Sequence, residues 1–265
     1  MDLLDKIVEA KRKEIAGARK SRTISELQAM IADSPRPRSL PEAILNNPPG
    51  IIAEIKRRSP SAGEIRGGLD REGVLKLSRL YAAGGAAALS ILTEAQFFGG
   101  SAEDLAAVKQ ETRLPVLMKD FILDEYQLFF ARAIGADSIL LIARILEDSR
   151  LRMFLQQGRE LGFEPLVEVH NQEELARVIK AGAVLIGINN RDLKTLKTDL
   201  AVTRSLLPGI PADRVAISES GIKTREEIEV LWSLGARGFL IGESLLTARD
   251  PAQKMRELTG LKMVS

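Results

Sequence analysis

From Gly50 to the end of the chain, short apolar runs alternate regularly with segments that carry the pattern of amphipathic helices. The apolar runs are near-continuous, which is typical of parallel strands covered by helices. Small turns such as Gly135-Ala136 and Ala181-Gly182 follow several helical segments, where glycine favours a left-handed helix cap. The expected strands span residues 50–55, 86–91, 115–119, 137–142, 164–169, 183–188, 213–218 and 237–242. The expected helices span about 70–84, 101–111, 124–134, 147–160, 171–180, 199–207, 223–235 and from 250 onward.

Eight strands alternating with eight helices predict βαβ units and a parallel sheet. The count favours a (β/α)8 TIM barrel over an open sheet, because about 215 residues from Gly50 onward is near the size of that fold. The segments 2–20 and Ser25–Ile31 are patterned as helices, and the proline-rich Asp33–Pro41 is patterned as a connector. We therefore expect one α/β barrel domain over residues 1–265, with residues 1–45 as a helical extension that caps the catalytic end.

The composition argues against several classes of function. The 265 residues carry a formal net charge of only +2, so the chain as a whole makes no case for nucleic acid as a partner. The absence of cysteine excludes disulfides, thiolate metal sites and a cysteine nucleophile. The single histidine, His170, argues against a histidine metal cluster or a Ser-His-Asp triad, and is more typical of a loop or cap residue. With no signal peptide and no apolar run that could span a bilayer, we expect a cytoplasmic protein.

Polar residues follow the apolar runs at most of the expected strand ends, where barrel enzymes place their active sites. Glu54 and Lys56 lie two residues apart in the first run, so both point to one face. The other strand ends carry Thr93-Glu94, Lys119-Asp120, Glu168-Val-His170, Asn189-Asn190-Arg191, Glu219-Ser220 and Gly242-Glu243. The pattern predicts a charged catalytic or binding cup over an apolar floor, with solvated strand termini as the alternative. The arginines of Arg57-Arg58 and Arg36-Pro-Arg38 are expected to be solvated.

Two lysines and three glutamates in one cup offer amine and carboxylate chemistry. Charges of both signs shift one another's pKa values and allow mixed protonation near neutral pH. A Schiff base on a lysine is an alternative that the sequence does not require. The short loops Ser220-Gly221-Ile222 and Gly242-Glu243-Ser244 let backbone amides approach a phosphate, although tight βα turns would look the same.

Six motifs, in the same order, resemble those of the indole-3-glycerol phosphate synthase family. The resemblance covers nearly the whole chain, including the N-terminal extension. It implies a (β/α)8 barrel that converts 1-(2-carboxyphenylamino)-1-deoxyribulose 5-phosphate to indole-3-glycerol phosphate in tryptophan biosynthesis. Carbon dioxide and water are lost, and no cofactor or metal is needed. The motifs are Glu54-Ile-Lys56-Arg-Arg-Ser59-Pro60-Ser61, Leu89-Ser-Ile-Leu-Thr-Glu94, Leu117-Met-Lys119-Asp-Phe121, Leu166-Val-Glu168-Val-His170, Gly187-Ile-Asn189-Asn-Arg191-Asp-Leu193 and Ser218-Glu219-Ser220-Gly221-Ile222.

The resemblance also implies catalytic roles, carried over position by position. Lys119 is the expected general acid of ring closure, and Glu168 the acid–base partner in dehydration. Lys56 is expected to contact the substrate carboxylate and can also deliver a proton, so which lysine acts at which step stays open. Glu54 and Glu219 are expected to orient the two lysines. Asn189 is expected to hold a ribulose hydroxyl.

Substrate-binding residues follow from the same resemblance. The phosphate is expected at Ser59, at Ser220-Gly221 and at Gly242-Glu243, where Glu243 replaces a serine of some members and therefore offers its backbone amide. Arg191 is expected to meet the anthranilate carboxylate. The expected anthranilate pocket consists of Pro60, Phe98, Phe121, Leu140, Leu193, Leu196 and Ile222.

Two other functions stay open on the sequence. An enzyme like phosphoribosylanthranilate isomerase would share the phosphate loops, but would need neither two lysines at the first and third strands nor an N-terminal helical cap. A nucleic-acid-binding protein would use the basic residues of 11–22 and 36–38. We expect a monomer that binds a small phosphorylated substrate, with no nucleic-acid or membrane partner.

Overall fold

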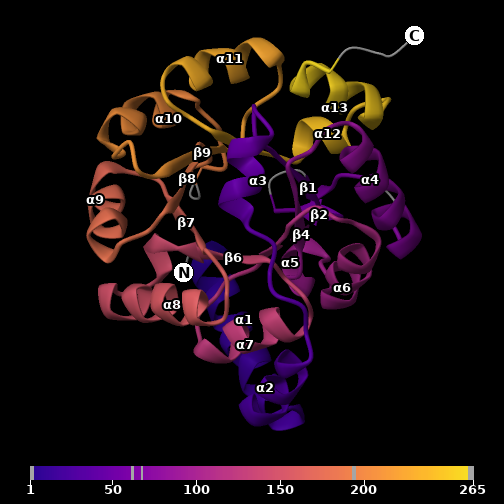
Figure 1. The fold of residues 1–265 in the computed structure, drawn as a ribbon, viewed down its shortest axis with the longest axis vertical. Helices are drawn as coiled ribbons and strands as arrows, with labels where there is room; N and C mark the ends of the chain where they lie inside the picture. The colour runs from indigo at the N-terminus through magenta and orange to yellow at the C-terminus, as the bar shows by residue number, and fades with distance from the viewer. Residues whose placement is uncertain (1–2, 61–62, 67, 193–194, 262–265) are drawn as a thin grey trace.

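The strands close into a parallel barrel in the computed structural model, which describes residues 3–60, 63–66, 68–192 and 195–261 (Figure 1). Their order around the barrel is β1-β10-β9-β8-β7-β6-β5-β4, and pairing of Ile51 with Phe239 closes the ring. The barrel strands are β1 (Ile51–Ile55), β4 (Ala88–Leu92), β5 (Val116–Lys119), β6 (Ser138–Ile142), β7 (Leu166–Val169), β8 (Leu185–Asn189), β9 (Val215–Glu219) and β10 (Gly238–Ile241). The predicted (β/α)8 barrel is confirmed.

An outer ring of helices covers the strands, because each helix turns an apolar stripe inward. Most of these helices begin at a Ser, Thr, Asp or Asn whose side chain accepts a hydrogen bond from the first turn, as Asp70 does from Gly73. The ring consists of α4 (Arg71–Ala83), α6 (Ala102–Glu111), α7 (Glu125–Ala133), α8 (Asp148–Glu160), α9 (Gln172–Ala181), α10 (Ala201–Leu206), α11 (Arg225–Ser233) and α13 (Pro251–Thr259).

Alternate residues of each strand serve different layers. In β1, Ile51, Ala53 and Ile55 pack outward among the helices, whereas Ile52 joins the apolar cluster inside the barrel. Glu54 has the same parity as Ile52, so it also points inward, one step nearer the C-terminal end. The strand pattern therefore stacks charged groups directly above an apolar floor.

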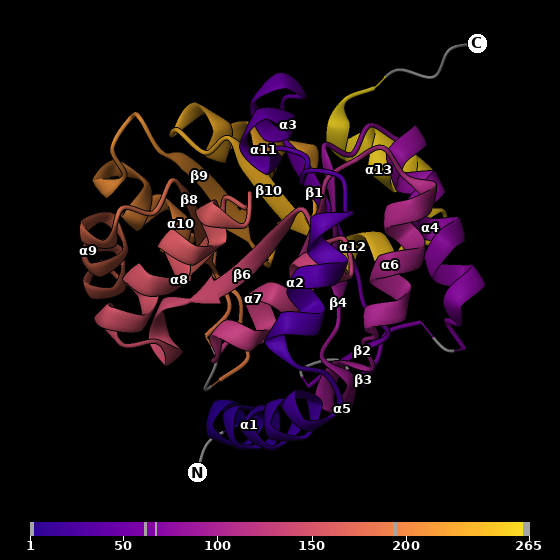
Figure 2. The ribbon, with the colours of Figure 1, turned by 60° about the horizontal axis from the view of Figure 1, so that its bottom comes forward.

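The N-terminal extension reaches both ends of the barrel (Figure 2). Helix α1 (Leu3–Ser21) lies across the end where the strands terminate, α2 (Ile24–Ala32) runs along the outside against α7, and α3 (Leu40–Asn46) covers the opposite end. Leu40 and Ile44 of α3 are fully buried in the apolar cluster inside the barrel. The connector expected up to Pro41 thus gives way to a helix, because proline is favourable in a first helical turn and Ser39 caps it.

Short elements decorate the loops. The β2 (Arg58–Ser59)–β3 (Gly63–Glu64) hairpin and α5 (Ala95–Phe98) follow β1 and β4, and α12 (Glu243–Leu246) follows β10, so all of them lie at the catalytic end. The 3₁₀ turns η1 (Ala143–Ile145) and η2 (Leu207–Gly209) complete the chain. None of the helices in the described parts of the chain has the length and apolar character needed to cross a membrane.

Candidate active site

A cavity of about 850 Å³ opens at the C-terminal end of the strands, above the apolar floor. Its wall draws on the loops after the strands and on helix α1, which contributes Leu3, Leu4 and Ile7. The sequence-predicted residues that line it are Glu54, Lys56, Ser59, Pro60, Phe98, Lys119, Phe121, Leu140, Glu168, Asn189, Arg191, Leu196, Ser220, Gly221, Ile222, Gly242 and Glu243. Glu219 is buried behind this wall, and Leu193 lies outside the described residues.

Glu54 and Lys56 form an ion pair on β1, with 2.5 Å between Lys56 Nζ and Glu54 Oε1. Burial favours protonation of Glu54, but the ammonium groups of Lys56 and Lys119 outweigh it and hold the pKa of Glu54 below its usual range. A glycine makes room for this carboxylate, because a Cβ at Gly242 would stand 2.7 Å from Glu54 Oε1. Glu54 and Lys56 therefore form a pair of one anion and one cation.

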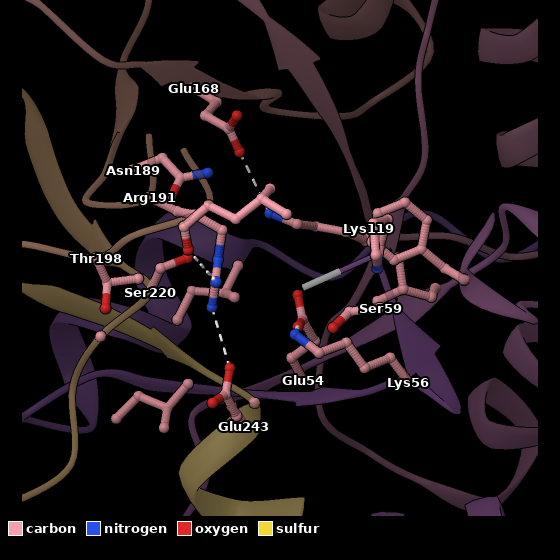
Figure 3. Close-up of a pocket in the computed structure, with 18 of the residues that line it drawn as sticks. Glu54, Lys56, Ser59, Lys119, Glu168, Asn189, Arg191, Thr198, Ser220 and Glu243 are labelled. Carbon is pink, nitrogen blue, oxygen red and sulfur yellow. Dashed lines mark hydrogen bonds and ion pairs between the residues drawn. The ribbon is translucent and has the colours of Figure 1, made fainter. Parts of the chain in front are cut away.

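Lys119 ends β5 and meets two carboxylates, of which Figure 3 shows that of Glu168. Its Nζ lies 2.8 Å from Glu219 Oε2 and 3.4 Å from Glu168 Oε2. Burial alone would lower the pKa of Lys119, but the carboxylates of Glu219, Glu168 and Glu54 raise it above its ordinary value. The lysine therefore carries its proton at neutral pH, surrounded by groups that can exchange it.

Glu219 is the carboxylate nearer to Lys119. Desolvation raises its pKa to about 7, with Lys119 opposing the rise and Glu168 and Glu54 adding to it. Glu219 Oε1 is buried without a hydrogen-bond partner among the described residues. A Cβ at Gly187 would come within 1.9 Å of that oxygen, so glycine is required on β8 for this carboxylate to sit where it does.

The loop after β8 is held by amide side chains. Asn189 Oδ1 accepts a hydrogen bond from the Arg191 backbone, and Arg191 reaches across the cavity to Glu243, with 3.0 Å between Nη2 and Oε2 (Figure 3). The buried Asn190, which was not predicted, donates to the carbonyls of Glu219 and Ser220. Asn190 thereby ties the β8 loop to the β9 loop.

The two predicted phosphate loops lie side by side along one wall of the cavity. Ser220 and Gly221 are successive left-handed residues, with φ of 66° and 83°, so the chain turns sharply after β9. Ser244 Oγ donates to the Ile222 carbonyl at 2.9 Å and joins this loop to α12. Three lysines that were not predicted also line the cavity, namely Lys197, Lys223 and Lys254.

The apolar side of the cavity is built around two aromatic rings. Phe98 from α5 and Phe121 after β5 stand with ring centroids 6.0 Å apart, tilted by 37°. Leu140, Leu196 and Ile222 line the same cavity. The site thus offers a flat apolar slot beside an array of charges.

A buried ion pair fastens α1 over this end of the barrel. Lys11 Nζ lies 2.8 Å from Asp120 Oδ1, and Lys11 is only 1% exposed. Thr93 Oγ1 donates to the other oxygen of Asp120 at 2.6 Å. A signal for Lys11 exists in the sequence, because it stands four residues from both Ile7 and Ile15 and so interrupts the buried stripe of α1.

Within the described residues, no group of three or more His, Asp or Glu side chains is arranged to hold a metal ion.

Comparison with known proteins identifies relatives over the whole barrel. The family model described as Indole-3-glycerol phosphate synthase matches residues 4–258. The indole-3-glycerol phosphate synthase of Desulforamulus reducens is 44% identical over 258 residues, covering 97% of this chain and 96% of that protein. That of Desulfosudis oleivorans is 44% identical over 261 residues, covering 97% and 98%. A crystal structure of 3-hexulose-6-phosphate synthase shares the fold, with TM-score 0.66, 17% identity, and coverage of 80% of this chain and 98% of that one.

Proposed function

This chain belongs to the indole-3-glycerol phosphate synthase family, and from that premise we propose which residues carry each step of the reaction. The enzyme is a carboxy-lyase of tryptophan biosynthesis. It closes the indole ring of 1-(2-carboxyphenylamino)-1-deoxyribulose 5-phosphate with loss of carbon dioxide and water. The observation that carries the residue assignment is Lys119, an ammonium held between two carboxylates at the cavity floor.

Ring closure joins the carboxylate-bearing ring carbon to the ketone carbon of the ribulose chain. As that bond forms, the ketone oxygen gains negative charge and must take up a proton. Lys119 is the proposed donor, because its neighbours keep it protonated and a positioned acid lowers the barrier for such a transfer. The Phe98–Phe121 slot is proposed to hold the aromatic ring against the ketone, so that the reacting carbons are aligned before they meet.

Decarboxylation follows once the ring carbon is tetrahedral, since the electrons of the breaking carbon–carboxylate bond then restore the aromatic ring. Lys56 and Arg191 are the proposed partners of that carboxylate, because both are cations that line the cavity. Dehydration then needs one proton delivered to the leaving hydroxyl and one removed from the neighbouring carbon. Glu168 is the proposed acid–base group, within 3.4 Å of Lys119.

The remaining assignments concern position. Glu54 and Glu219 are proposed to orient the two lysines, which their ion pairs support. Asn189 is proposed to hold a ribulose hydroxyl, and the phosphate is placed at the loops after β9 and β10 together with Ser59. The lysines that line the same cavity support an anion there. Leu193, Leu196, Pro60, Leu140 and Ile222 are the proposed apolar contacts of the substrate.

The N-terminal extension is proposed to act as a cap that belongs to the same domain as the barrel. Its contribution of Leu3, Leu4 and Ile7 to the cavity wall supports this role. We also propose that the enzyme is a cytoplasmic monomer, since the proposed groups all come from one chain. Light scattering of the purified protein measures the oligomeric state, and a dimeric mass would overturn that part of the proposal.

A turnover assay tests the proposed function directly. Indole fluorescence should appear when the carboxyphenylamino-deoxyribulose phosphate is added to the enzyme, and it should be weak with the dephosphorylated compound. Phosphoribosylanthranilate serves as the matched control, because it shares the phosphate and the anthranilate ring but is the substrate of the rival isomerase reaction. Turnover of phosphoribosylanthranilate alone would refute the assignment.

A further inference from the structure

His170 has no part in the steps described above, although its ring lies beside Glu168, 3.5 Å from that carboxylate. It is the only histidine of the chain, and it directly follows β7. It stands two residues after Glu168, so the two side chains leave the backbone toward the same face. The His170 side chain is only 9% exposed, although the residue lies in the predicted loop, between β7 and α9.

The imidazole is bracketed by two carboxylates. Its Nε2 lies 3.5 Å from Glu168 Oε1, and its Nδ1 lies 3.3 Å from Glu174 Oε2 in the first turn of α9. The His170 backbone N–H also donates to Glu174 Oε2 at 2.7 Å. Nε2 itself is buried with no hydrogen-bond partner among the described residues, so it stands ready to accept or donate one.

The two oxygens of Glu168 therefore face different proton carriers. Oε2 faces Lys119 at 3.4 Å, on the side of the cavity, and Oε1 faces His170. A proton held at Oε1 can therefore pass to His170, whereas a proton held at Oε2 faces Lys119 and first reaches Oε1 by rotation of the carboxyl group. This geometry is that of a relay rather than of a single donor.

The charged groups that surround His170 favour such a role. Burial alone would lower the pKa of the imidazole, but the carboxylates of Glu174, Glu168 and Glu219 raise it above its ordinary value. These groups come from α9, β7 and β9, and the Lys119 ammonium faces the other oxygen of Glu168. The imidazole therefore holds its proton to higher pH than an ordinary histidine does.

We propose that His170 is a positioning residue that relays protons between Glu168 and solvent. In the relay, protonated Glu168 gives its proton from Oε1 to neutral Nε2, which leaves a carboxylate and an imidazolium. Glu174 stabilises the imidazolium at Nδ1. The imidazolium then loses its Nδ1 proton to water, which leaves neutral His170 with the transferred proton on Nε2, and proton exchange with water restores the Nδ1–H form. Glu168 is thereby reset for the next turnover. The proposal rests on the acid–base role proposed for Glu168.

Two variants separate a relay from a simple hydrogen bond. His170→Gln keeps a nitrogen donor at the distance of Nε2, and His170→Asn keeps one at the distance of Nδ1, but neither amide can carry a proton. At low buffer concentration, both should lower kcat at least about tenfold, a modest part of what a positioned acid–base group contributes. KM should stay unchanged, and added imidazole buffer should restore kcat in proportion to its concentration.

The outcomes that overturn the relay are distinct. If His170→Gln keeps the wild-type kcat while His170→Asn loses it, the residue is only a hydrogen-bond donor to Glu168. A loss that imidazole does not restore points to a structural role. Glu168→Gln is the parallel test of the underlying assignment: full activity of that variant would overturn the role of Glu168, whereas inactivity of Glu168→Gln together with unchanged His170 variants would overturn the relay alone.

A third variant leaves the imidazole in place and guards against loss of folding. Glu174→Gln can still accept the backbone hydrogen bond of His170, but it removes the charge that raises the imidazole pKa. Because the relay needs neutral His170, kcat should rise as the pH passes the pKa of the imidazole. This rising limb of the kcat–pH profile should move to lower pH in Glu174→Gln. An unshifted limb contradicts the relay.

Discussion

The two ends of this barrel are covered by neighbouring parts of one N-terminal segment, yet they are held by opposite kinds of contact. At the end where the strands begin, α3 inserts Leu40 and Ile44, both fully buried, into the apolar cluster between the strands. At the catalytic end, α1 is fastened by the ion pair of Lys11 with Asp120 and leaves a cavity of about 850 Å³ beneath it. Both ends are closed, but only the end where the strands begin is filled with packed side chains.

This difference separates stability from chemistry. Apolar burial contributes about 25 cal/mol for each Å² removed from water, so the packing of α3 at the end where the strands begin stabilises the fold directly. Charges such as Lys119 and Glu219 at the catalytic end are costly to bury and are retained only where paired. Barrel enzymes in general place function at the C-terminal ends of the strands and stability at the other end. Variants at each end should therefore change different measured quantities.

The largest expected effect is that of Lys119→Met, which keeps the length of the side chain and removes the proton. A positioned general acid contributes on the order of 10² to 10⁴ in rate, so kcat should fall at least about a hundredfold. KM should change little, since the phosphate loops are untouched. Steady-state kinetics by indole fluorescence measure both quantities, and thermal unfolding provides the control, because the barrel should remain folded. A rise in KM with kcat unchanged would make Lys119 a binding residue and would leave ring closure to Lys56.

Ile44→Ala, at the end where the strands begin, should lower stability and leave kcat unchanged. Removing a fully buried isoleucine side chain costs about 2 to 5 kcal/mol, because a cavity is left that the surroundings only partly fill. The free energy of unfolding in urea should fall by that amount, while kcat under folding conditions should match wild type. Leu45→Ala is the matched control, since Leu45 is 50% exposed on the same helix and should change stability little. A large loss of kcat in folded Ile44→Ala would mean that the two ends are coupled.

Lys11→Met tests the fastening of α1 at the catalytic end. Methionine suits the apolar stripe between Ile7 and Ile15, but it leaves the Asp120 carboxylate buried without its cation. The expected cost is about 1 to 3 kcal/mol of unfolding free energy, because Asp120 keeps its hydrogen bonds from Thr93 and the Phe121 backbone. We also expect a higher KM, since α1 forms part of the cavity wall.

The control for this variant is Lys13→Met, which removes an exposed ion pair with Glu9 on the same helix. Exposed pairs contribute about 0 to 1 kcal/mol, so that variant should resemble wild type. Equal effects of the two substitutions would mean that the buried pair does not hold α1 in place.

The smallest expected effect is a change in the pH dependence of stability in Glu219→Gln. Because burial raises the pKa of Glu219 to about 7 from the ordinary value of 4.5, the folded state binds its proton more tightly than the unfolded state does. Its contribution to stability is therefore complete below pH 4.5 and is lost as the pH rises through about 7. Melting temperatures measured across this window should fall less steeply in Glu219→Gln than in wild type. Parallel curves would show that Glu219 is ionised throughout.

The architecture could be predicted from sequence because eight apolar runs and the glycine turns between them leave few alternatives. The strand ends pointed to the cavity for the same reason, since side chains alternate strictly along a strand. What escaped prediction depends on long-range packing. Pro41 was predicted to end a connector, but it lies in the first turn of α3. Lys11 was grouped with the basic residues of 11–22, but it is buried in an ion pair with Asp120.

Arg36 and Arg58 are exposed as expected, but the other two arginines that were expected to be solvated were misjudged for the same reason. Arg57 was expected to be solvated, but its side chain donates to the carbonyls of Leu69 and Gly99 and pairs with Asp104. Arg38 likewise donates to the carbonyls of Thr112 and Leu114. A planar guanidinium can satisfy several buried carbonyls at once. No local pattern predicts these contacts, because the acceptors lie 12 to 76 residues away in the chain.

Closure of the ring by β1 and β10 has a consequence for the order in which the molecule can be made. Ile51 pairs with Phe239, so the first barrel strand to leave the ribosome keeps an open edge until nearly the whole chain has been synthesised. Unpaired strand edges are templates for pairing with other chains, and contacts between distant residues form slowly. The growing chain therefore carries an exposed edge for most of its synthesis, and a chain that stops before β10 keeps two of them, on β1 and on β9. Prematurely terminated products should accordingly aggregate rather than fold as smaller barrels.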